Sequence, residues 1–340
     1  MTELPRTVDV AIVGGGFAGM STAWWLARRG VNDVIVLERE AELGRYASGR
    51  CAGLGRQLAE DDLVTALTVT GAAHLRTRLS HAWMATGGIL TFDDLAQARS
   101  YIARAARMGI ASNRLDRDAV VAMWPQLASV DIKAALHVPS DGLIDITALL
   151  ATYAEGARIA RETAVERIIP TARGATLLTN RGTYVARVVV DATGAWAGRT
   201  TGDPPLDSFK RHVYVLEAAA PTGVPYVWHL GASELYFRVK DGQILTSPCD
   251  TTPTEAGDQH PDPGGESLLR ARLAGSSLAA ASIGRAWACQ RTFPRRLAMK
   301  LERDPDRPWL VWAAGLGGHG ATASAAVGET VAGLVIAALG

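Results

Sequence analysis

The chain has 340 residues, of which 48% are hydrophobic and 20% charged, a composition typical of a globular protein large enough to form two domains. Its 35 lysines and arginines are balanced by 34 acidic residues, so the chain lacks the long-range positive field that binding to nucleic acid requires. Its three cysteines, Cys51, Cys249 and Cys289, are widely separated and lack CxxC spacing, which favours neither a disulfide framework nor a zinc site.

The first forty residues predict a unit that binds the phosphates of a dinucleotide. A β-branched strand, a G-x-G-x-x-G turn, a helix that stops at a glycine, a second strand and an acidic residue follow one another in the order that such a unit needs. These parts are 8–13 for the strand, 14–19 for the turn, 20–29 and Gly30 for the helix and its end, 34–37 for the second strand, and Glu38.

Each glycine of the turn has a predicted task. Gly14 permits the tight turn, Gly16 lets the backbone approach a pyrophosphate, and Gly19 lets the helix pack close to the strand. The helix N-terminus offers N–H groups to the anion, and Glu38 can accept hydrogen bonds from ribose hydroxyls. Because FAD and NAD share the ADP half, this unit does not distinguish the two cofactors.

Three later segments favour FAD. Residues 44–53 are rich in small side chains, where an NAD enzyme would continue into a crossover helix. The strand 188–190 runs into the turn 191–196, whose small residues let the backbone come close to a nucleotide. The glycine-rich turn 311–320 precedes a helical stretch, and its N–H donors suit the negative charge of a reduced flavin.

The ends of the chain carry no predicted membrane signal. Residues 1–9 lack the apolar core of a signal peptide, and the apolar stretch 331–339 is too short to cross a bilayer. We therefore expect a cytoplasmic protein with no membrane span.

With these segments, the chain resembles the FAD-dependent oxidoreductases related to D-amino-acid oxidase, glycine oxidase and monomeric sarcosine oxidase. The markers are GGGFAG with Glu38, ASGRCAG at 47–53, DATGAW at 191–196 and GLGGHGATASAAVGE from Gly315, and the likeness covers almost the whole chain. The segments around Tyr236 and Arg291 look most like D-arginine and related D-amino-acid dehydrogenases, whereas Cys51 departs from the usual Asn or Ser. The expected residues for non-covalent FAD are Gly14, Gly16, Phe17, Ala18, Gly19, Glu38, Arg39, Arg45, Ala47, Ser48, Arg50, Cys51, Ala52, Gly53, Val165, Ala192, Thr193, Gly194, Trp196, Arg291, Gly315, Gly317, Gly318, His319, Gly320, Ala321 and Thr322.

The spacing of these segments predicts the architecture. The fold class is α/β: a glutathione-reductase-type Rossmann domain that binds FAD, with a second, substrate domain built on an antiparallel sheet. Strand-like runs at 212–217, 235–239 and 243–245 belong to this sheet, and 251–265 is predicted to be a surface loop. The predicted FAD domain comprises 1–80, 140–206 and 296–340, and the predicted substrate domain comprises 81–139 and 207–295.

A flavin performs the redox step itself, so the protein has to position the substrate and hold its charged groups. A guanidinium can hold both carboxylate oxygens of an amino acid, and Arg291 is the leading candidate because it corresponds to the carboxylate-binding arginine of the relatives. Tyr236 can add a hydrogen bond to this carboxylate. A tyrosine that only packs in the protein core is an equal alternative. Arg211 is a second candidate contact unless it belongs to an exposed basic cluster with Lys210 and His212.

Further candidate residues have less defined roles. Tyr46 sits where the relatives face the flavin or the substrate entrance. His319, in the last glycine turn, is expected to contact the flavin, and a role as base is the alternative. Cys289 lies in a segment comparable to the flavin-linking cysteine of sarcosine oxidases, but its neighbours match poorly, so a buried thiol is expected.

The sequence therefore predicts an FAD enzyme that oxidises a C–N bond of a small amino acid or amine. Arg291, Tyr236 and His319 are the expected catalytic residues, and oxygen or a quinone is the expected electron acceptor. Two alternatives remain open: a 2-hydroxy-acid dehydrogenase, and a flavoprotein subunit that acts only with a partner.

Overall fold

The strand predicted near the start of the chain, β1 (Arg6–Val13), lies inside an eight-stranded sheet of the computed structural model, which describes residues 6–203, 206–294 and 299–340. Val10 and Ile12 pack into one apolar cluster, whereas Ala11 and Val13 pack into another. Successive strand residues point to opposite faces, so β1 is covered on both sides, and its uninterrupted run of apolar residues follows from this.

Parallel pairing joins five strands of this sheet in the order β9, β2, β1, β12, β20. Antiparallel strands extend it, with β11 and β10 beyond β12, and β19 beside β20. Residues from the start, middle and end of the chain therefore lie in one sheet, and the carboxyl ends of β1, β12 and β20 meet at one edge. The bounds are β2 (Val34–Leu37), β9 (Ile159–Ala160), β10 (Val165–Thr171), β11 (Gly174–Thr179), β12 (Gly182–Asp191), β19 (Lys300–Arg303) and β20 (Leu310–Ala314).

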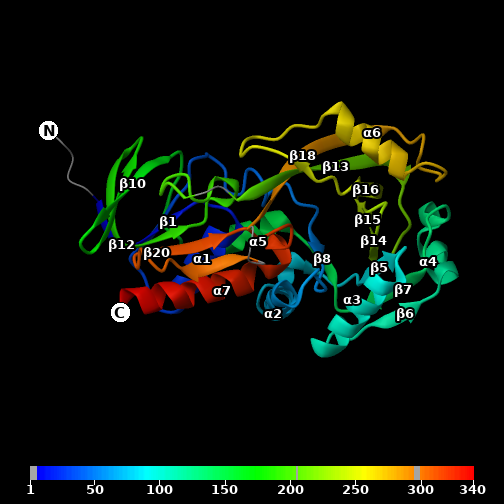
Figure 1. The fold of residues 1–340 in the computed structure, drawn as a ribbon, viewed down its shortest axis with the longest axis horizontal. Coiled ribbons are helices and arrows are strands. Elements are labelled where there is room, and N and C mark those ends of the chain that lie inside the picture. The colour runs from blue at the N-terminus through cyan, green and yellow to red at the C-terminus, as the bar shows by residue number, and fades with distance from the viewer. Residues whose placement is uncertain (1–5, 204–205, 295–298) are drawn as a thin grey trace.

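Helices cover one face of the parallel strands, and the C-terminal helix α7 (Gly320–Leu339) runs beside the sheet in Figure 1. It packs against α1 (Phe17–Arg28) and α2 (Asp62–Arg78), and α1 also contacts α5 (Ile146–Ala154). The indole N–H of Trp25 donates to the carbonyl of Ala325 at 2.7 Å, which joins α1 to α7 in the core. The first and last helices of the chain are thus held in a single layer.

Among the described residues, α7 is the one helix long and apolar enough by length and composition to cross a membrane, with a mean hydropathy of 1.6. The apolar stretch near the end of the sequence was expected to be too short to cross a bilayer. Its length was underestimated, because the helix begins at Gly320 rather than near Val331. However, 56% of its 18-residue apolar window is buried inside the protein, and a core helix passes the same test. The helix is therefore weak evidence for a membrane span.

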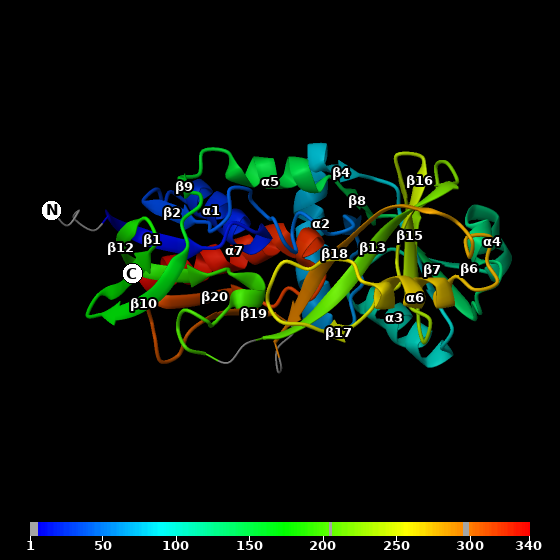
Figure 2. The same cartoon turned by 90° about the horizontal axis from the view of Figure 1, so that it is seen from above.

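A nine-stranded sheet forms the other end of the molecule, where β13 and β18 reach from it toward the first sheet (Figure 2). Its path is β17, β13, β16, β15, β14, β5, β7, β6, with β18 pairing β13, and its helices are α3 (Leu95–Arg107), α4 (Arg117–Met123) and α6 (Pro263–Arg272). The strand bounds are β5 (Gly88–Phe92), β6 (Asn113–Leu115), β7 (Ala134–Val138), β13 (Asp207–Ala219), β14 (Tyr226–Leu230), β15 (Leu235–Lys240), β16 (Gln243–Ser247), β17 (Thr252–Pro253) and β18 (Ile283–Phe293).

Shorter elements complete the secondary structure of the described residues. They are a three-stranded sheet in the order β3, β8, β4, and three 3₁₀ turns. Their bounds are β3 (Leu54–Gly55), β8 (Gly142–Ile144), β4 (Trp83–Met84), and the turns η1 (Ser80–Ala82), η2 (Pro125–Leu127) and η3 (Gly194–Trp196).

The predicted fold class is confirmed, with two differences in detail. The second sheet contains one parallel pair, β5 with β14, because a strand from the 81–139 stretch pairs beside one from the 207–295 stretch. The predicted loop 251–265 ends early, because Asp262 accepts a hydrogen bond from the N–H of Gly265 and Pro263 begins α6. The division into two domains stays a prediction, and its boundary at 295/296 lies outside the described residues.

The contact between α1 and α7 predicts opposite effects for two glycines of α7. A Cβ at Gly328 would lie 2.5 Å from the backbone carbon of Ser21, whereas one at Gly333 would meet nothing nearer than an arginine side-chain nitrogen at 3.5 Å. We expect Gly328→Ala to lower the free energy of unfolding by about 1–3 kcal/mol through overpacking. Gly333→Ala should raise it by up to about 1 kcal/mol, the helix propensity difference. Urea unfolding of both variants tests this; equal effects would contradict the assigned packing.

Candidate cofactor cleft and active site

A cleft of about 400 Å³ lies at the edge where the carboxyl ends of β1, β12 and β20 meet. Its walls come from the turns that follow these strands, from the 44–51 segment and from the end of β18. Ligands of open α/β sheets bind at this edge because the connecting loops there leave a crevice. The three glycine-lined segments predicted to bind FAD therefore face one space.

The turn after β1 is shaped so that its backbone borders the cleft. Gly14 has a φ of +107°, and a Cβ at Gly19 would lie 2.0 Å from the carbonyl oxygen of Gly14. Thus Gly14 and Gly19 are required by the protein's own packing. A Cβ at Gly16 would meet only the hydroxyl of Ser48, at 3.0 Å. The lack of a side chain at Gly16 leaves room for a ligand instead, which fits the predicted approach of a pyrophosphate.

The caps of the α-helices in the described residues separate into two groups. Helices α2 to α6 each begin with an aspartate whose side chain accepts a backbone N–H. The N-caps of α1 and α7, Gly16 and His319, make no such bond, and neither helix has an acidic residue in its first turn. The two uncapped helices are those that begin at the cleft, so their N–H donors and positive dipole ends suit a bound anion.

Two carboxylates shape the loops on either side of this turn. Glu38 accepts hydrogen bonds from the N–H groups of Gly15, at 2.6 Å, and Glu40, at 2.8 Å, which holds its carboxylate at the cleft edge. Asp191 is buried and accepts bonds from Thr193 and from the N–H of Gly198, so it folds the 191–196 turn toward the cleft. Burial raises the pKa of Asp191. The ribose contact predicted for Glu38 stays a prediction.

The structure places most of the predicted cofactor residues on the walls of the cleft. These are Gly14, Gly16, Phe17, Ala18, Glu38, Arg39, Arg45, Ala47, Ser48, Cys51, Val165, Ala192, Thr193, Gly194, Trp196, Arg291, Gly315, Gly317, Gly318, Gly320 and Ala321. The others, Gly19, Arg50, Ala52, Gly53, His319 and Thr322, lie outside this lining and contact other parts of the protein.

Arg291 lies near the end of β18, against the last glycine turn. A Cβ at Gly318 would lie 3.1 Å from its Cδ, so the missing side chain there makes room for the arginine. Its Nη1 donates to the carbonyl of Gln290 at 3.1 Å and lies 3.0 Å from the thiol sulfur of Cys289. Burial by itself lowers the pKa of Arg291, but the Cys289 thiol and the Tyr236 phenol raise it above its ordinary value. The site therefore keeps a cation at the cleft.

Tyr236 lies in β15 of the nine-stranded sheet and packs in one apolar cluster with Ala52 of the cofactor segment. It is 2% exposed, and its hydroxyl has no hydrogen-bond partner among the described residues. Burial raises the pKa of this phenol, and the nearby Arg291 opposes that shift. A buried hydroxyl without a partner is costly, which is consistent with a role toward a ligand.

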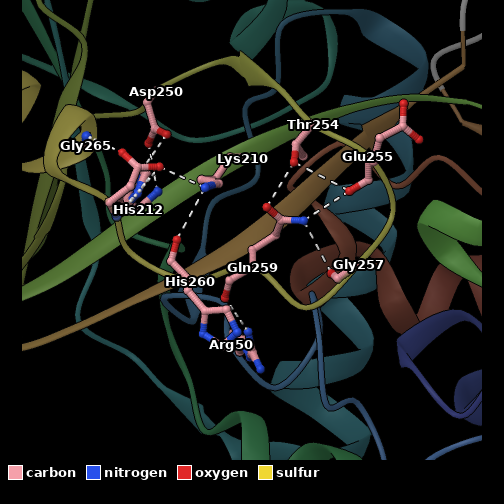
Figure 3. Close-up of polar contacts among 11 residues, drawn as sticks. Arg50, Lys210, His212, Asp250, Thr254, Glu255, Gly257, Gln259, His260 and Gly265 are labelled. Carbon is pink, nitrogen blue, oxygen red and sulfur yellow. Dashed lines mark hydrogen bonds and ion pairs between the residues drawn. The ribbon is translucent and has the colours of Figure 1, made fainter.

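The alternative of an exposed basic cluster at 210–212 is wrong because His212 is buried and Lys210 is only 18% exposed; Figure 3 shows the polar contacts of both. His212 is 1% exposed, with its Nδ1 2.8 Å from Asp250, while Lys210 pairs with Asp262 at 2.8 Å. The Nε of Arg211 donates to the carbonyl of Asp250 at 3.0 Å. Arg50 turns toward the loop that holds Gln259, whose carbonyl accepts its bond at 2.9 Å.

Tyr46 lies on the nucleotide side of the cleft and not beside Tyr236. Its ring is 4.8 Å from that of Trp196, and its hydroxyl donates to Glu40 at 2.5 Å. Arg39 lies over both rings, 4.4 Å from Trp196 and 5.4 Å from Tyr46. These contacts group Tyr46 with residues expected to bind the cofactor, so its predicted contact with substrate is not supported by its neighbours.

His319 turns its ring away from the cleft lining, toward two residues that the sequence pattern did not reveal. Its Nε2 lies 2.8 Å from a carboxylate oxygen of Glu60, and the other oxygen of Glu60 lies 2.6 Å from Arg56. Trp228 and Arg238 were missed as well: Trp228 packs against Tyr236 at 5.1 Å, and the Nε of Arg238 is buried without a partner among the described residues. Only the R-x-x-x-E spacing of Arg56 and Glu60 could have pointed to that pair.

Comparison with known proteins likewise indicates an FAD-dependent oxidoreductase over most of the chain. The model of the family described as DAO, FAD dependent oxidoreductase, matches residues 9–334. The mitochondrial sarcosine dehydrogenase of Mus musculus is 30% identical over 240 residues, which are 63% of this chain and 26% of that protein. Glycine oxidase of Geobacillus kaustophilus (strain HTA426) is 31% identical over 214 residues, 56% of this chain and 55% of that protein. The match thus spans about a quarter of the length of the sarcosine dehydrogenase and about half of the length of the glycine oxidase.

Solved structures share the fold along nearly the whole chain. L-proline dehydrogenase from P. horikoshii superimposes with a TM-score of 0.88 at 22% identity, covering 98% of this chain and 94% of that one. The glycine oxidase structure from Geobacillus kaustophilus gives a TM-score of 0.84 at 25% identity, covering 98% and 95%.

The open space at Gly16 predicts a variant that loses the cofactor without losing the fold. Gly16→Val would project its side chain into the cleft, with only Ser48 to displace, so we expect at least a tenfold weaker FAD affinity, about 1.4 kcal/mol. The melting temperature of the FAD-free protein should stay near that of the parent. Gly19→Val is the matched control, because it clashes with Gly14 and should lower that temperature. Fluorescence titration with FAD and thermal unfolding test this; unchanged FAD affinity in Gly16→Val would contradict the placement.

Proposed function

The chain belongs to the FAD dependent oxidoreductase family, and from this premise we propose that it oxidises the C–N bond of a small amino acid or amine. The product is an imine, which hydrolyses in water to a keto acid or an aldehyde. Relatives named for sarcosine, glycine and 4-methylaminobutanoate support an amino-acid or amine substrate.

The observation that carries the proposal is the position of Arg291. Its guanidinium is a permanent cation that lines the cleft beside the last glycine turn, and Cys289 and Gln290 both contact the same terminal nitrogen, Nη1. A guanidinium can hold both oxygens of a carboxylate. We therefore propose that Arg291 binds the substrate carboxylate and that the Tyr236 hydroxyl donates a hydrogen bond to it.

The residues of the cleft fit FAD: Gly16 would leave space for the pyrophosphate, Glu38 would accept hydrogen bonds from the ribose, and the N-terminus of α7 would face the flavin ring. When bound, FAD supplies a ring nitrogen, N5, that accepts a hydride from the substrate carbon. Arg291 and Tyr236 then fix the substrate by its carboxylate, which leaves the Cα–H bond as the part that has to face the ring. The buried Tyr236, Ala52 and Val213 exclude water from this side.

The contacts of His319 favour an amine over a hydroxy acid. Oxidising an alcohol requires removal of the hydroxyl proton, whereas an amine that binds in its neutral form needs no base during hydride transfer. His319 lies outside the residues that line the cleft, where its Nε2 faces Glu60 at 2.8 Å, so the described lining residues supply no imidazole to act as that base. Two alternative functions are the oxidation of 2-hydroxy acids and the role of a flavoprotein subunit that acts only with a partner.

Three finer parts of the proposal come from the sequence resemblance. The substrate is an α-amino acid of the kind oxidised by D-arginine and related D-amino-acid dehydrogenases. FAD is bound without a covalent link: Cys289 is 1% exposed and contacts Arg291, which supports a packing role for its thiol. Electrons then pass to oxygen or to a quinone.

The direct experiment is anaerobic mixing of the FAD-loaded chain with sets of D-amino, L-amino, N-methylamino and 2-hydroxy acids, followed by the flavin absorbance. We expect bleaching by amino compounds and none by hydroxy acids. Bleaching by hydroxy acids alone would overturn the proposal, and no bleaching by any compound would favour the partner-dependent subunit. Adding air or a quinone analogue to the bleached protein then identifies the acceptor.

Arg291→Met should raise KM for a carboxylate-bearing substrate about 100-fold, since a charge-assisted pair contributes about 1.5–3 kcal/mol. The substitution removes the cation but keeps a long apolar side chain. Arg285→Met on the same strand is the matched control, because Arg285 is exposed. Steady-state kinetics should show the rise in Arg291→Met only. An unchanged KM in that variant would show that the carboxylate binds elsewhere.

A further inference from the structure

We propose that Glu60 and Arg56 are positioning residues that hold His319 and set the charge beside the flavin end of the cleft. The proposal rests on FAD binding in the cleft and not on the choice of substrate. Arg56 and Glu60 do not line the cleft themselves, and the proposal gives them a function behind its lining.

The three side chains form a continuous polar contact. Glu60 accepts from Arg56 with one carboxylate oxygen, at 2.6 Å, and faces Nε2 of His319 with the other, at 2.8 Å. Arg56 is 3% exposed and His319 is 9% exposed, whereas 58% of the Glu60 side-chain surface is open. The carboxylate is thus the open member of a group whose other two members are buried.

The distances define which atoms carry hydrogens. A carboxylate 2.8 Å from Nε2 requires the hydrogen of the imidazole to be on Nε2. The guanidinium nitrogen of Arg56 is 3.3 Å from the same Nε2, and two donors cannot bond to each other, so Arg56 bonds to Glu60 alone. The neighbouring Arg56 and His319 hold the pKa of Glu60 well below its ordinary range. Glu60 is therefore a carboxylate that neutralises Arg56.

This group is attached to the turn that faces the cofactor. The neighbours of His319 on both sides, Gly318 and Gly320, line the cleft, and His319 is the N-cap of α7. One turn later, the hydroxyl of Thr322 donates to the carbonyl of Leu54 at 3.1 Å. The start of α7 is therefore held against the 54–60 segment at two points, and a change in charge at Glu60 or Arg56 acts within a few residues of the cleft.

Arg56 also contacts the nine-stranded sheet. The guanidinium of Arg56 lies 4.1 Å from the ring centre of Trp228, which in turn packs 5.1 Å from the ring of Tyr236. Tyr101, Tyr226, Asp141 and Cys249 are further titratable groups that interact electrostatically with Arg56 or Glu60. None of them gives Arg56 a second hydrogen bond among the described residues, so Glu60 is the partner that compensates its buried charge.

The test is the midpoint potential of the bound flavin, measured with redox dyes in the absence of substrate. Glu60→Gln leaves the charge of Arg56 uncompensated, which should stabilise the more negative, reduced flavin and raise the potential. Arg56→Met leaves the negative charge of Glu60 and should lower it. The double variant should return toward the parent value. Opposite single shifts that cancel in the double variant are the signature of charge, which a loss of packing alone would not give.

Asp62→Asn is the matched control. Asp62 also pairs with buried and exposed arginines, Arg104 at 2.8 Å and Arg107 at 2.9 Å, but it does not contact His319 or the α7 turn, and no shift is expected. Shifts of the same sign in both single variants, or unchanged potentials in proteins that still bind FAD, would overturn the proposal. If Arg56→Met fails to bind FAD, Arg56→Lys, which keeps the cation, must bind FAD with the parent potential; if Glu60→Gln fails, Glu60→Asp, which keeps the carboxylate, must do so. Failure of the conservative variant also overturns the proposal. Since no substrate is present, these results are independent of the oxidation assay.

Discussion

The organisation of the molecule depends on the parallel pairing of β1, β12 and β20. Because the three strands run in the same direction, the turns that follow them meet at one edge, although they are separated by most of the chain. Two helices begin at this edge without side-chain caps, in a protein whose other five α-helices in the described residues are capped by aspartate. Small residues and the N-terminal ends of two helices are thus concentrated where a nucleotide has to bind.

The nine-stranded sheet gives this cleft its chemistry. Its long strands β13 and β18 extend toward the first sheet (Figure 2). Arg291, near the end of β18, packs against Gly318 of the last glycine turn. Tyr236 and Trp228 lie in neighbouring strands of the same sheet and pack toward the 52–56 segment. Arg291 thereby lines the cleft, while the phenol of Tyr236 and the ring of Trp228 pack behind the lining from the same sheet, an arrangement suited to holding a charged group in a fixed orientation.

The sequence predicted those features that depend on local order. The strand, turn and helix at 8–29 and the three small-residue segments could be recognised because each needs glycine or alanine at set positions. Contacts between distant segments could not: Glu60 and His319 are 259 residues apart, and nothing in either neighbourhood marks the other. Tyr46 was assigned to the substrate by its place in the chain, but its contacts with Arg39 and Trp196 are set by tertiary packing. The start of α6 was missed because Asp262 and Pro263 are residue types that are equally common in loops.

The most direct measurement is the absorption spectrum of the purified chain after incubation with FAD and gel filtration, repeated on the supernatant of acid-precipitated protein. We predict a flavin spectrum corresponding to one FAD per chain, with all of the colour in the supernatant after precipitation. A colourless protein that takes up no flavin would contradict the convergence of the three segments around one cofactor. A yellow precipitate would reveal a covalent link and contradict the proposed non-covalent binding of FAD.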